Sequence, residues 1–339
     1  MEHMYSDEQR MLISSLRSFV QNELRPHEAE TDRLGYVPEE LGKQIVKKSI
    51  ELGFYAANLP EDIGGGGLNY VSMSLMEREF GKTTYGLHGF CHRPSEILMA
   101  CVDGQIEEYL LPCVRGDRKE FFGLTEPGAG SDIMSMQTKA EKKGDDWIIN
   151  GSKHFISSPI KADFAILFAC TGIDETERGQ RKRVTAFLVD ADLDGFSIER
   201  GPRCAAQRAY QTFQLSFDNV CVPSTKILGE EGKGLDLAGK WLRMGRVWVA
   251  AAACGKAELL LGMATEWSAN RKQFGRPIGK FQGTSFKLAD MATELKAADL
   301  LVMNAAQKAD MGIMEDNDAA MAKLFACEMV GRAADQTVQ

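Results

Sequence analysis

The segment from Thr125 to Asp132, with the sequence TEPGAGSD, has residue types that could hold a ligand through the backbone. Its glycines let backbone N–H groups approach a ligand closely, and the hydroxyls of Thr125 and Ser131 add hydrogen-bonding groups. The alternative is an ordinary glycine-rich hairpin loop, since short loops of this composition are common. By itself the segment predicts a turn and leaves both interpretations open.

A second segment runs from Asn150 to Ser157 with the sequence NGSKHFIS. Asn-Gly predicts a tight hairpin turn between two strands. Phe155 and Ser157 then share one face of the second strand, because side chains alternate along a strand. An aromatic ring beside a hydroxyl could flank a planar heterocycle. The alternative is a surface hairpin whose aromatic residue packs on the core.

A third segment, from Arg271 to Ile278, has the sequence RKQFGRPI and is followed by Gln282. The pattern predicts a helix that ends near Gly275 and then a turn. A basic cluster with a nearby glutamine suits a pyrophosphate and its ribose, because guanidinium groups match phosphate geometry. A solvated basic helix end is the alternative.

The elements that position these segments change character twice along the chain. The first part is helical: Ser6 with Gln9 forms a capping box, and an apolar stripe with helical spacing follows it. From about Phe121 to Pro223 the period becomes two, with a continuous apolar run over 164–169, which predicts a compact β barrel or sandwich. After Gly234 long helical patterns return and predict a helical bundle.

We therefore expect a multidomain α and β fold with a helical domain over residues 1–120, a middle β barrel over 121–233 and a C-terminal helical bundle over 234–339. The chain shows no alternating βαβ pattern, which argues against a Rossmann or TIM-barrel architecture.

Composition narrows the classes of partner. The 339 residues are 44% hydrophobic and carry a net charge of −8, which argues against nucleic acid or an anionic membrane as the main partner. The eight cysteines include no C-x-x-C pair, so zinc or iron–sulfur ligation has little support and we expect no metal site. The charged N-terminus is unlike a secretory signal, and we expect a cytoplasmic protein with reduced thiols.

Together, in this order and on an α–β–α chain, the three segments resemble the acyl-CoA dehydrogenase family over essentially the whole chain. TEPGAGSD is highly specific to that family and its relatives. Further matches are PEDIGGG at 60–66, LGEEGKG at 228–234 and the terminal segment 331–339. The resemblance implies FAD-dependent α,β-dehydrogenation of an acyl-CoA thioester, in which a glutamate takes the α-proton while hydride leaves the β-carbon for the flavin. Electrons then pass to an electron-transfer flavoprotein.

The resemblance also implies roles for individual residues. The positions that match flavin contacts in the β domain are Leu124, Thr125, Gly130, Ser131, Phe155 and Ser157, the last of which replaces a common Thr. The positions that match contacts with the ADP half of FAD in a neighbouring subunit are Arg271, Phe274, Gln282 and Gln339. A shared cofactor site implies a homo-oligomer, either a dimer or a tetramer.

For the substrate, the resemblance places Ser131 at the acyl-CoA entry and Arg246 near the CoA chain. Arg93 falls where many members have an apolar pocket residue, so we expect it to recognise a polar or anionic end of the acyl group. The alternative is a surface helix start with Pro94 in its first turn. Glu96 could also pair with Arg93 one turn along, which would leave a neutral pocket.

The chain departs from the family at the catalytic base. The usual glutamate lies after the position of Gln339, and some relatives carry the base at the position of Gly245, which cannot abstract a proton. We therefore expect the chain as given to be a fragment of a longer enzyme and catalytically impaired. The alternatives are another flavin-binding member of the fold, such as an acyl-CoA oxidase or a flavin monooxygenase, or an inactive truncated form.

Overall fold

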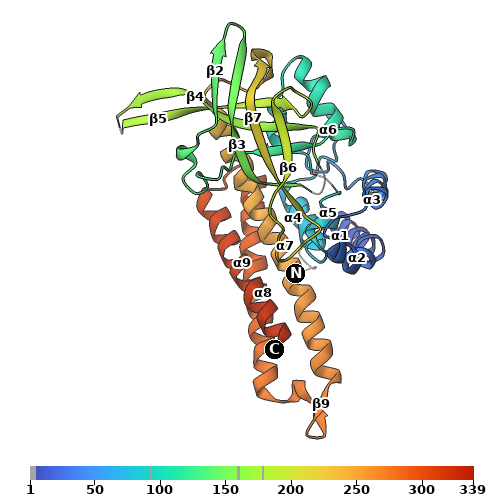
Figure 1. Cartoon of the computed structure of the whole chain (residues 1–339). Helices are drawn as coiled ribbons and strands as arrows, with labels where there is room; N and C mark the ends of the chain where they lie inside the picture. Colours follow the sequence, from blue (N-terminus) through green and yellow to red (C-terminus); the bar gives the residue numbers. More distant parts are fainter. Residues whose placement is uncertain (1–4, 92, 159–160, 178) are drawn as a thin grey trace. The chain divides into compact units, whose positions relative to one another are not determined.

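The computed structural model describes residues 5–91, 93–158, 161–177 and 179–339. Its helices are α1 (Asp7–Phe19), α2 (Glu28–Leu34), α3 (Glu39–Glu51), α4 (Tyr70–Phe80), α5 (Tyr85–His88), α6 (Leu111–Arg115), α7 (Gly234–Asn270), α8 (Gln282–Asp310) and α9 (Asp316–Val338). Its strands are β1 (Glu120–Gly123), β2 (Lys139–Lys143), β3 (Asp146–Ser158), β4 (Phe164–Thr176), β5 (Gly179–Asp190), β6 (Phe196–Arg200), β7 (Gln211–Pro223), β8 (Ile227–Leu228), β9 (Lys272–Gln273) and β10 (Arg276–Pro277). The order of helices, then strands, then helices confirms the predicted fold class (Figure 1).

The chain divides into two compact units, each built from separate stretches of sequence. Unit 1 takes the N-terminal segment up to His27, Leu68–Thr84 and Leu242–Gln339. Unit 2 takes Glu28–Gly67 and Tyr85–Trp241. The predicted three-domain bounds follow sequence order and stay a prediction.

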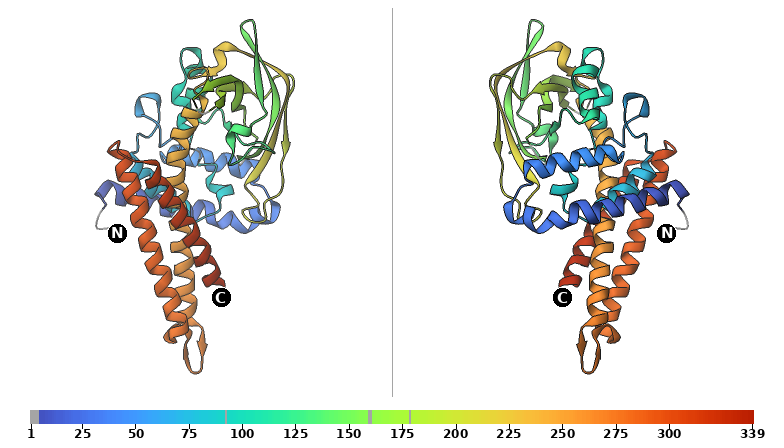
Figure 2. Two further views of the ribbon diagram at one scale, coloured as in Figure 1. Left: turned by 90° about the vertical axis from the view of Figure 1, so that its left-hand side faces the viewer. Right: turned by 90° about the vertical axis from the view of Figure 1, so that its right-hand side faces the viewer.

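Unit 1 is helical. α1 begins as predicted, because Ser6 and Gln9 form both hydrogen bonds of a capping box, and Ile13, Leu16 and Phe19 are buried along one stripe. α8 and α9 lie side by side in both views of Figure 2. Many buried residues of the two helices are small and recur at alternating spacings of three and four. The buried positions are Met291, Leu295, Ala298, Asp299, Val302, Ala305 and Ala306 on α8 and Asp318, Ala319, Ala322, Ala326, Met329 and Ala333 on α9. This heptad-like pattern lets two antiparallel helices approach closely.

By length and composition alone, helix α7 is long and apolar enough to cross a membrane. Of its most apolar stretch, 44% is buried inside the protein. Core helices of soluble proteins pass the same test.

Unit 2 holds one curled sheet in the strand order β6-β7-β3-β2-β4-β5-β8, with β1 pairing β4 in parallel (Figure 1). β4 crosses the middle of the sheet, and all of its residues from Phe164 to Ala169 are fully buried, as the continuous apolar run predicts. The inner face of β7 presents Phe213, Leu215 and Phe217 to the core. The parallel pairing places Gly123 opposite Leu167, so the TEPGAGSD segment leaves the sheet directly after β1.

Candidate functional site

The loop that follows β1 is a closed turn with an open outer face. Glu126 N donates to Ala129 O at 3.0 Å, and Ala129 N donates back to Glu126 O at 3.2 Å. Gly128 and Gly130 are exposed, and a Cβ added at either would meet no atom within 4 Å. Among the described residues the space beside both glycines is therefore open, and a ligand can approach their backbone.

A buried ion pair lies beneath this loop. Lys153 Nζ donates to Glu126 Oε1 at 2.7 Å and to Leu124 O at 3.1 Å, and its side chain is fully buried. Burial would raise the pKa of Glu126, but hydrogen bonds from Gln137, Lys153 and Thr138 outweigh it and hold that pKa below its ordinary value. Burial lowers the pKa of Lys153, and Glu126 opposes that shift.

Strand β3 bulges next to the loop. Its pairing with β7 shifts register between Lys153 and Ile156, and within this bulge His154 N donates to Thr125 O at 2.8 Å. Phe155 has a φ of 54°, in the left-handed region that a bulky residue seldom adopts. Phe155 is 57% exposed, whereas Ile156 is buried. The bulge therefore holds an aromatic side chain on the outside of the sheet.

The exposed face of β3 agrees with one prediction. Phe155 and Ser157 are both exposed, whereas Ile156 and Ser158 are buried. The two predicted flavin contacts thus share a face of the strand. The Ser157 hydroxyl donates to the carbonyl of Phe155 at 3.4 Å.

The prediction of a hairpin turn at Asn150 and Gly151 is wrong, because both residues lie inside β3. The turn between β2 and β3 falls earlier, at Gly144, whose φ is 64°. Asn150 instead accepts a hydrogen bond from Asn219 N at 2.9 Å across a register shift between β3 and β7. A Cβ at Gly151 would lie 2.5 Å from Thr138 Oγ1, so this glycine serves a close approach.

The helix end predicted near Gly275 is also wrong. α7 ends at Asn270, and β9 and β10 form a small hairpin whose tip, Phe274 and Gly275, has φ values of 51° and 75°. This pairing ends the helix earlier than the basic residues suggest. Phe274 is 92% exposed at the tip. Arg271 and Gln282 are exposed in the same part of unit 1.

Three further predicted positions lie in unit 1. Arg246 is exposed on α7, and Gly245 beside it has open space where a Cβ would be. Gln339 is exposed directly after α9. In unit 2, Leu124 is buried, Thr125 is half-buried and Ser131 is exposed.

The segment that carries Arg93 is not a helix start. α5 ends at His88, and the next helical turn is a 3₁₀ turn over Glu96–Ala100 with Ser95 as its N-cap, so Pro94 precedes the turn. Polar contacts decide this conformation: Asn58 Nδ2 donates to Pro94 O at 3.0 Å, and Ser95 N donates to the Glu120 carboxylate at 2.7 Å.

Arg93 itself is half-buried, and its charge affects the pKa of two neighbouring groups. Burial raises the pKa of Glu96 above its ordinary value, while Arg93 and a hydrogen bond from Asn58 act against that rise. Burial also raises the pKa of Tyr210, and Arg93 opposes this shift too. Arg93 is therefore close enough to Glu96 for its charge to act on that carboxyl, which is consistent with the pairing alternative, and it acts in the same way on the half-buried Tyr210.

Two lysines received no role from the sequence. Lys153 lies four residues after the buried Ile149 in the same strand. Because residues an even number apart lie on the same face of a strand, this spacing could have indicated an inward-facing lysine. Lys119 is also buried; its Nζ donates to Gly89 O at 3.3 Å, and burial lowers its pKa to about 8. No motif marks Lys119, since it directly precedes a short strand.

Sequence comparison matches nearly the whole chain to one family. The family models of the acyl-CoA dehydrogenase N-terminal, middle and C-terminal domains match residues 6–117, 121–220 and 232–339, respectively. The 3-(aryl)acrylate reductase of Clostridium sporogenes is 38% identical, over 99% of this chain and 89% of that protein. The caffeyl-CoA reductase-Etf complex subunit CarC of Acetobacterium woodii is 35% identical, over 99% and 88%.

Structural comparison agrees. The glutaryl-CoA dehydrogenase of Mycobacterium smegmatis, solved in complex with FADH2, superposes with a TM-score of 0.89 at 27% identity, and the match covers 99% of this chain and 85% of that one. The chain belongs to the acyl-CoA dehydrogenase family, whose members are FAD-dependent oxidoreductases that act on acyl-CoA.

Proposed function

We propose that this protein catalyses FAD-dependent α,β-dehydrogenation of an acyl-CoA thioester and exchanges electrons with an electron-transfer flavoprotein. The observation that carries the proposal is the pairing of an open glycine loop with an outward aromatic ring at the β3 bulge. The Etf complex to which the Acetobacterium woodii relative belongs supports the partner.

The residues of unit 2 fit a flavin in three ways. The accessible backbone at Gly128 and Gly130 leaves room for close approach. The exposed ring of Phe155 offers a face for stacking on a planar heterocycle. The neighbouring imidazole of His154, with its ring centroid 4.0 Å from that of Phe155, has a buried Nδ1 without a hydrogen-bond partner among the described residues, which is a polar group that a ligand could satisfy.

In this proposal Leu124 and Thr125 hold the ring through backbone and hydroxyl, and Ser131 and Ser157 add hydroxyls. Phe155 covers one face of the ring. When bound, FAD would supply the acceptor for the hydride that leaves the β-carbon. The protein's part is to orient the thioester against it and to stabilise charge on the thioester oxygen. Gly245 has no side chain that could take the α-proton, so the base must come from another position.

We further propose a homo-oligomer held by the C-terminal helices. Phe286 and Leu300 on α8 and Met321 and Leu324 on α9 are each at least 48% exposed. Several large apolar side chains on one helical layer indicate a protein contact surface. In such an assembly Arg271, Phe274, Gln282 and Gln339 would hold the ADP half of a neighbouring subunit's FAD.

The reverse reaction is the second candidate. Both sequence relatives named above are reductases, one of an aryl acrylate and one of caffeyl-CoA. This favours reduction of an α,β-unsaturated, aryl-bearing acyl-CoA as the physiological direction. The chemistry and the cofactor site are the same in both directions.

One experiment tests the proposed reaction and its direction. We expect purified protein to show flavin absorbance, directly or after addition of FAD. Anaerobic addition of saturated acyl-CoAs of different chain length and polarity should bleach it. A protein reduced chemically and then reoxidised by cinnamoyl-CoA faster than by crotonyl-CoA would favour the reductase direction. Protein that takes up no flavin after addition of FAD would overturn the proposed function.

A further inference from the structure

We propose that Lys153 and Glu126 are a positioning pair for the cofactor: from inside the protein they fix the backbone of Leu124 and Thr125 and the ring of Phe155. The inference rests on the FAD site proposed above. Both side chains are buried, 0% and 4% exposed, on the inner side of the loop. They act through other residues.

The first step is that one ammonium group holds the loop on both sides of Thr125. Lys153 Nζ reaches Leu124 O at 3.1 Å and Glu126 Oε1 at 2.7 Å. The next residue of the strand, His154, donates its backbone N–H to Thr125 O at 2.8 Å. Three successive loop residues are thereby bonded to two successive residues of β3.

The second step is that Glu126 ties the same loop to the residues that precede β2. Its Oε2 accepts from Gln137 N at 2.5 Å, and its Oε1 accepts from Thr138 N at 3.0 Å. Every described contact of this carboxylate is thus with Lys153 or with backbone N–H groups that fix loop position. Because an unpaired buried charge is costly, each member of the pair requires the other.

The third step links the pair to Phe155. A left-handed conformation at a bulky residue persists only where its surroundings enforce it. The anchored residues Lys153 and His154 directly precede Phe155, and the register shift of β3 falls between Lys153 and Ile156. The pair therefore sets both edges of the proposed flavin platform, the loop on one side and the aromatic ring on the other.

The test is FAD binding by apoprotein, measured as a dissociation constant by titration, together with the visible spectrum of the bound flavin. We expect Lys153→Met to raise the dissociation constant at least about tenfold, which corresponds to about 1.4 kcal/mol, and to change the shape of the flavin band. Lys153→Arg should bind FAD more tightly than Lys153→Met, because it keeps the charge and donors. The matched control is Lys139→Met on β2, which removes an exposed ion pair with Glu141 at 2.6 Å and should leave both readouts unchanged.

Thermal unfolding of each apoprotein separates positioning from stability. If folded Lys153→Met binds FAD as tightly as the wild type and with the same spectrum, the pair is only structural and the inference is wrong, whatever the melting temperature. If Lys153→Met does not fold, Glu126→Gln carries the same comparison, and FAD binding and a spectrum that are unchanged in this variant contradict the inference. A wild-type chain that binds no FAD would overturn the proposed function itself. A wild type and a variant that both bind FAD equally well would overturn only the role of the pair.

Discussion

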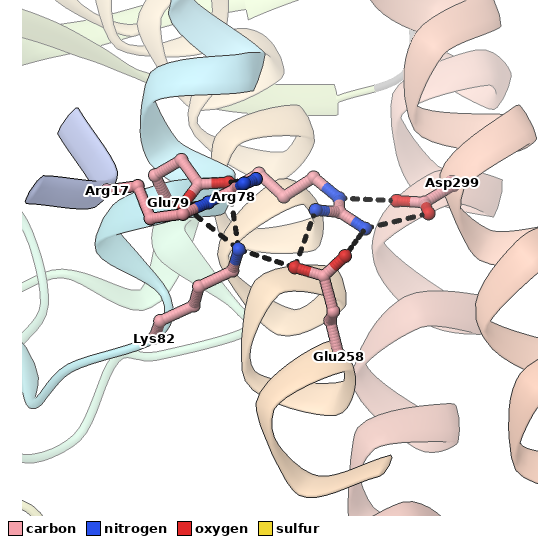
Figure 3. A network of polar contacts seen from close by, with 6 residues as sticks. All are labelled: Arg17, Arg78, Glu79, Lys82, Glu258 and Asp299. Carbon is pink, nitrogen blue, oxygen red and sulfur yellow. Dashed lines mark hydrogen bonds and ion pairs between the residues drawn. The ribbon is translucent and has the colours of Figure 1, made fainter. Parts of the chain in front are cut away.

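Arg78 of α4 and Asp299 of α8 form a two-point ion pair inside unit 1, with Nε to Oδ1 at 2.9 Å and Nη2 to Oδ2 at 3.1 Å. The same guanidinium donates twice to Glu258 of α7, at 3.1 and 3.2 Å. Figure 3 shows six residues of this network, Arg17, Arg78, Glu79, Lys82, Glu258 and Asp299. Among these six residues three cations balance three anions, and their ion pairs join α1, α4, α7 and α8.

Removing the central cation should destabilise the protein strongly. Arg78→Leu leaves two carboxylates without their main partner, and breaking a buried pair from one side costs about 3 kcal/mol or more. The matched control is Arg243→Leu, which removes an exposed ion pair of the same unit, with Asp316 at 2.6 Å. We expect that control to cost less than about 1 kcal/mol. Urea denaturation measures both, and equal losses would mean that the network contributes no more than a surface pair.

The same network predicts a pH dependence of stability. Burial alone would raise the pKa of Glu258, but Arg78 and Lys82 outweigh it and lower that pKa from 4.5 to about 2. Because the folded-state pKa is the lower one, ionised Glu258 stabilises the fold above about pH 4.5, and this contribution is lost as the pH falls toward 2. Glu258 is partly exposed, so we expect about 1 kcal/mol after solvent screening.

Glu258→Gln tests that sign. Stability of the wild type should fall more steeply than that of the variant as the pH is lowered from about 5 to about 3. Denaturation midpoints at several pH values measure it. Parallel curves for the two proteins would show that Glu258 does not titrate differently in the folded state.

Arg93 offers a test of substrate polarity. If its guanidinium recognises an anionic acyl end, Arg93→Leu should weaken binding of glutaryl-CoA by about 10- to 100-fold, the value of one charged hydrogen bond. Binding of hexanoyl-CoA should not change. Glu96→Gln is the matched variant, because the structure places Glu96 near Arg93. Equal effects of Arg93→Leu on both ligands, measured by titration, would mean that the arginine pairs with Glu96 and is structural.

The proposed oligomer depends on the apolar surface of α8 and α9. Leu324→Glu places a charge on an exposed apolar position of α9 and should lower the mass of the assembly in sedimentation. Gln307→Glu adds the same charge at an exposed polar position of α8 and should not. A wild type that is monomeric with FAD fully bound would contradict the shared cofactor site.

Periodicity predicted the elements well, and local signals predicted turns less well. The stripe through Ile13 and Leu16 and the apolar run over 164–169 mark elements whose burial follows directly from spacing. The local predictions at Asn150-Gly151 and at Pro94 are wrong, because hydrogen bonds with residues distant in sequence stabilise other conformations there. Asn219 N donates to Asn150 inside a strand, and Asn58 donates to the carbonyl of Pro94.

The site was predictable as segments and not as a geometry. The sequence places Phe155 and Ser157 on one face of a strand, and the structure agrees. It does not show that Lys153 points to Glu126, because that contact joins residues 27 positions apart and depends on strand register. Nor does it show the left-handed conformation of Phe155, since a bulge depends on the partner strand.

That conformation leads to the last prediction, a trade between stability and cofactor binding at Phe155. Its left-handed φ of 54° carries a strain of about 1 kcal/mol for a bulky residue. Glycine and asparagine adopt this region more readily, and more than half of the surface of Phe155 is already exposed. Phe155→Gly and Phe155→Asn should therefore leave the apoprotein as stable as the wild type or more so. Both should bind FAD more weakly, because they lack the ring that covers the flavin.

Phe155→Trp is the control, since it keeps an aromatic face and the strain and should keep FAD affinity. Thermal unfolding of the apoproteins and titration with FAD measure the two effects separately. Apoprotein that is destabilised by both Phe155→Gly and Phe155→Asn would show that the ring packs for stability. Unchanged FAD affinity in both would remove Phe155 from the cofactor site. If both variants are equally or more stable than the wild type and bind FAD more weakly, the strained conformation of Phe155 serves cofactor binding and does not stabilise the fold.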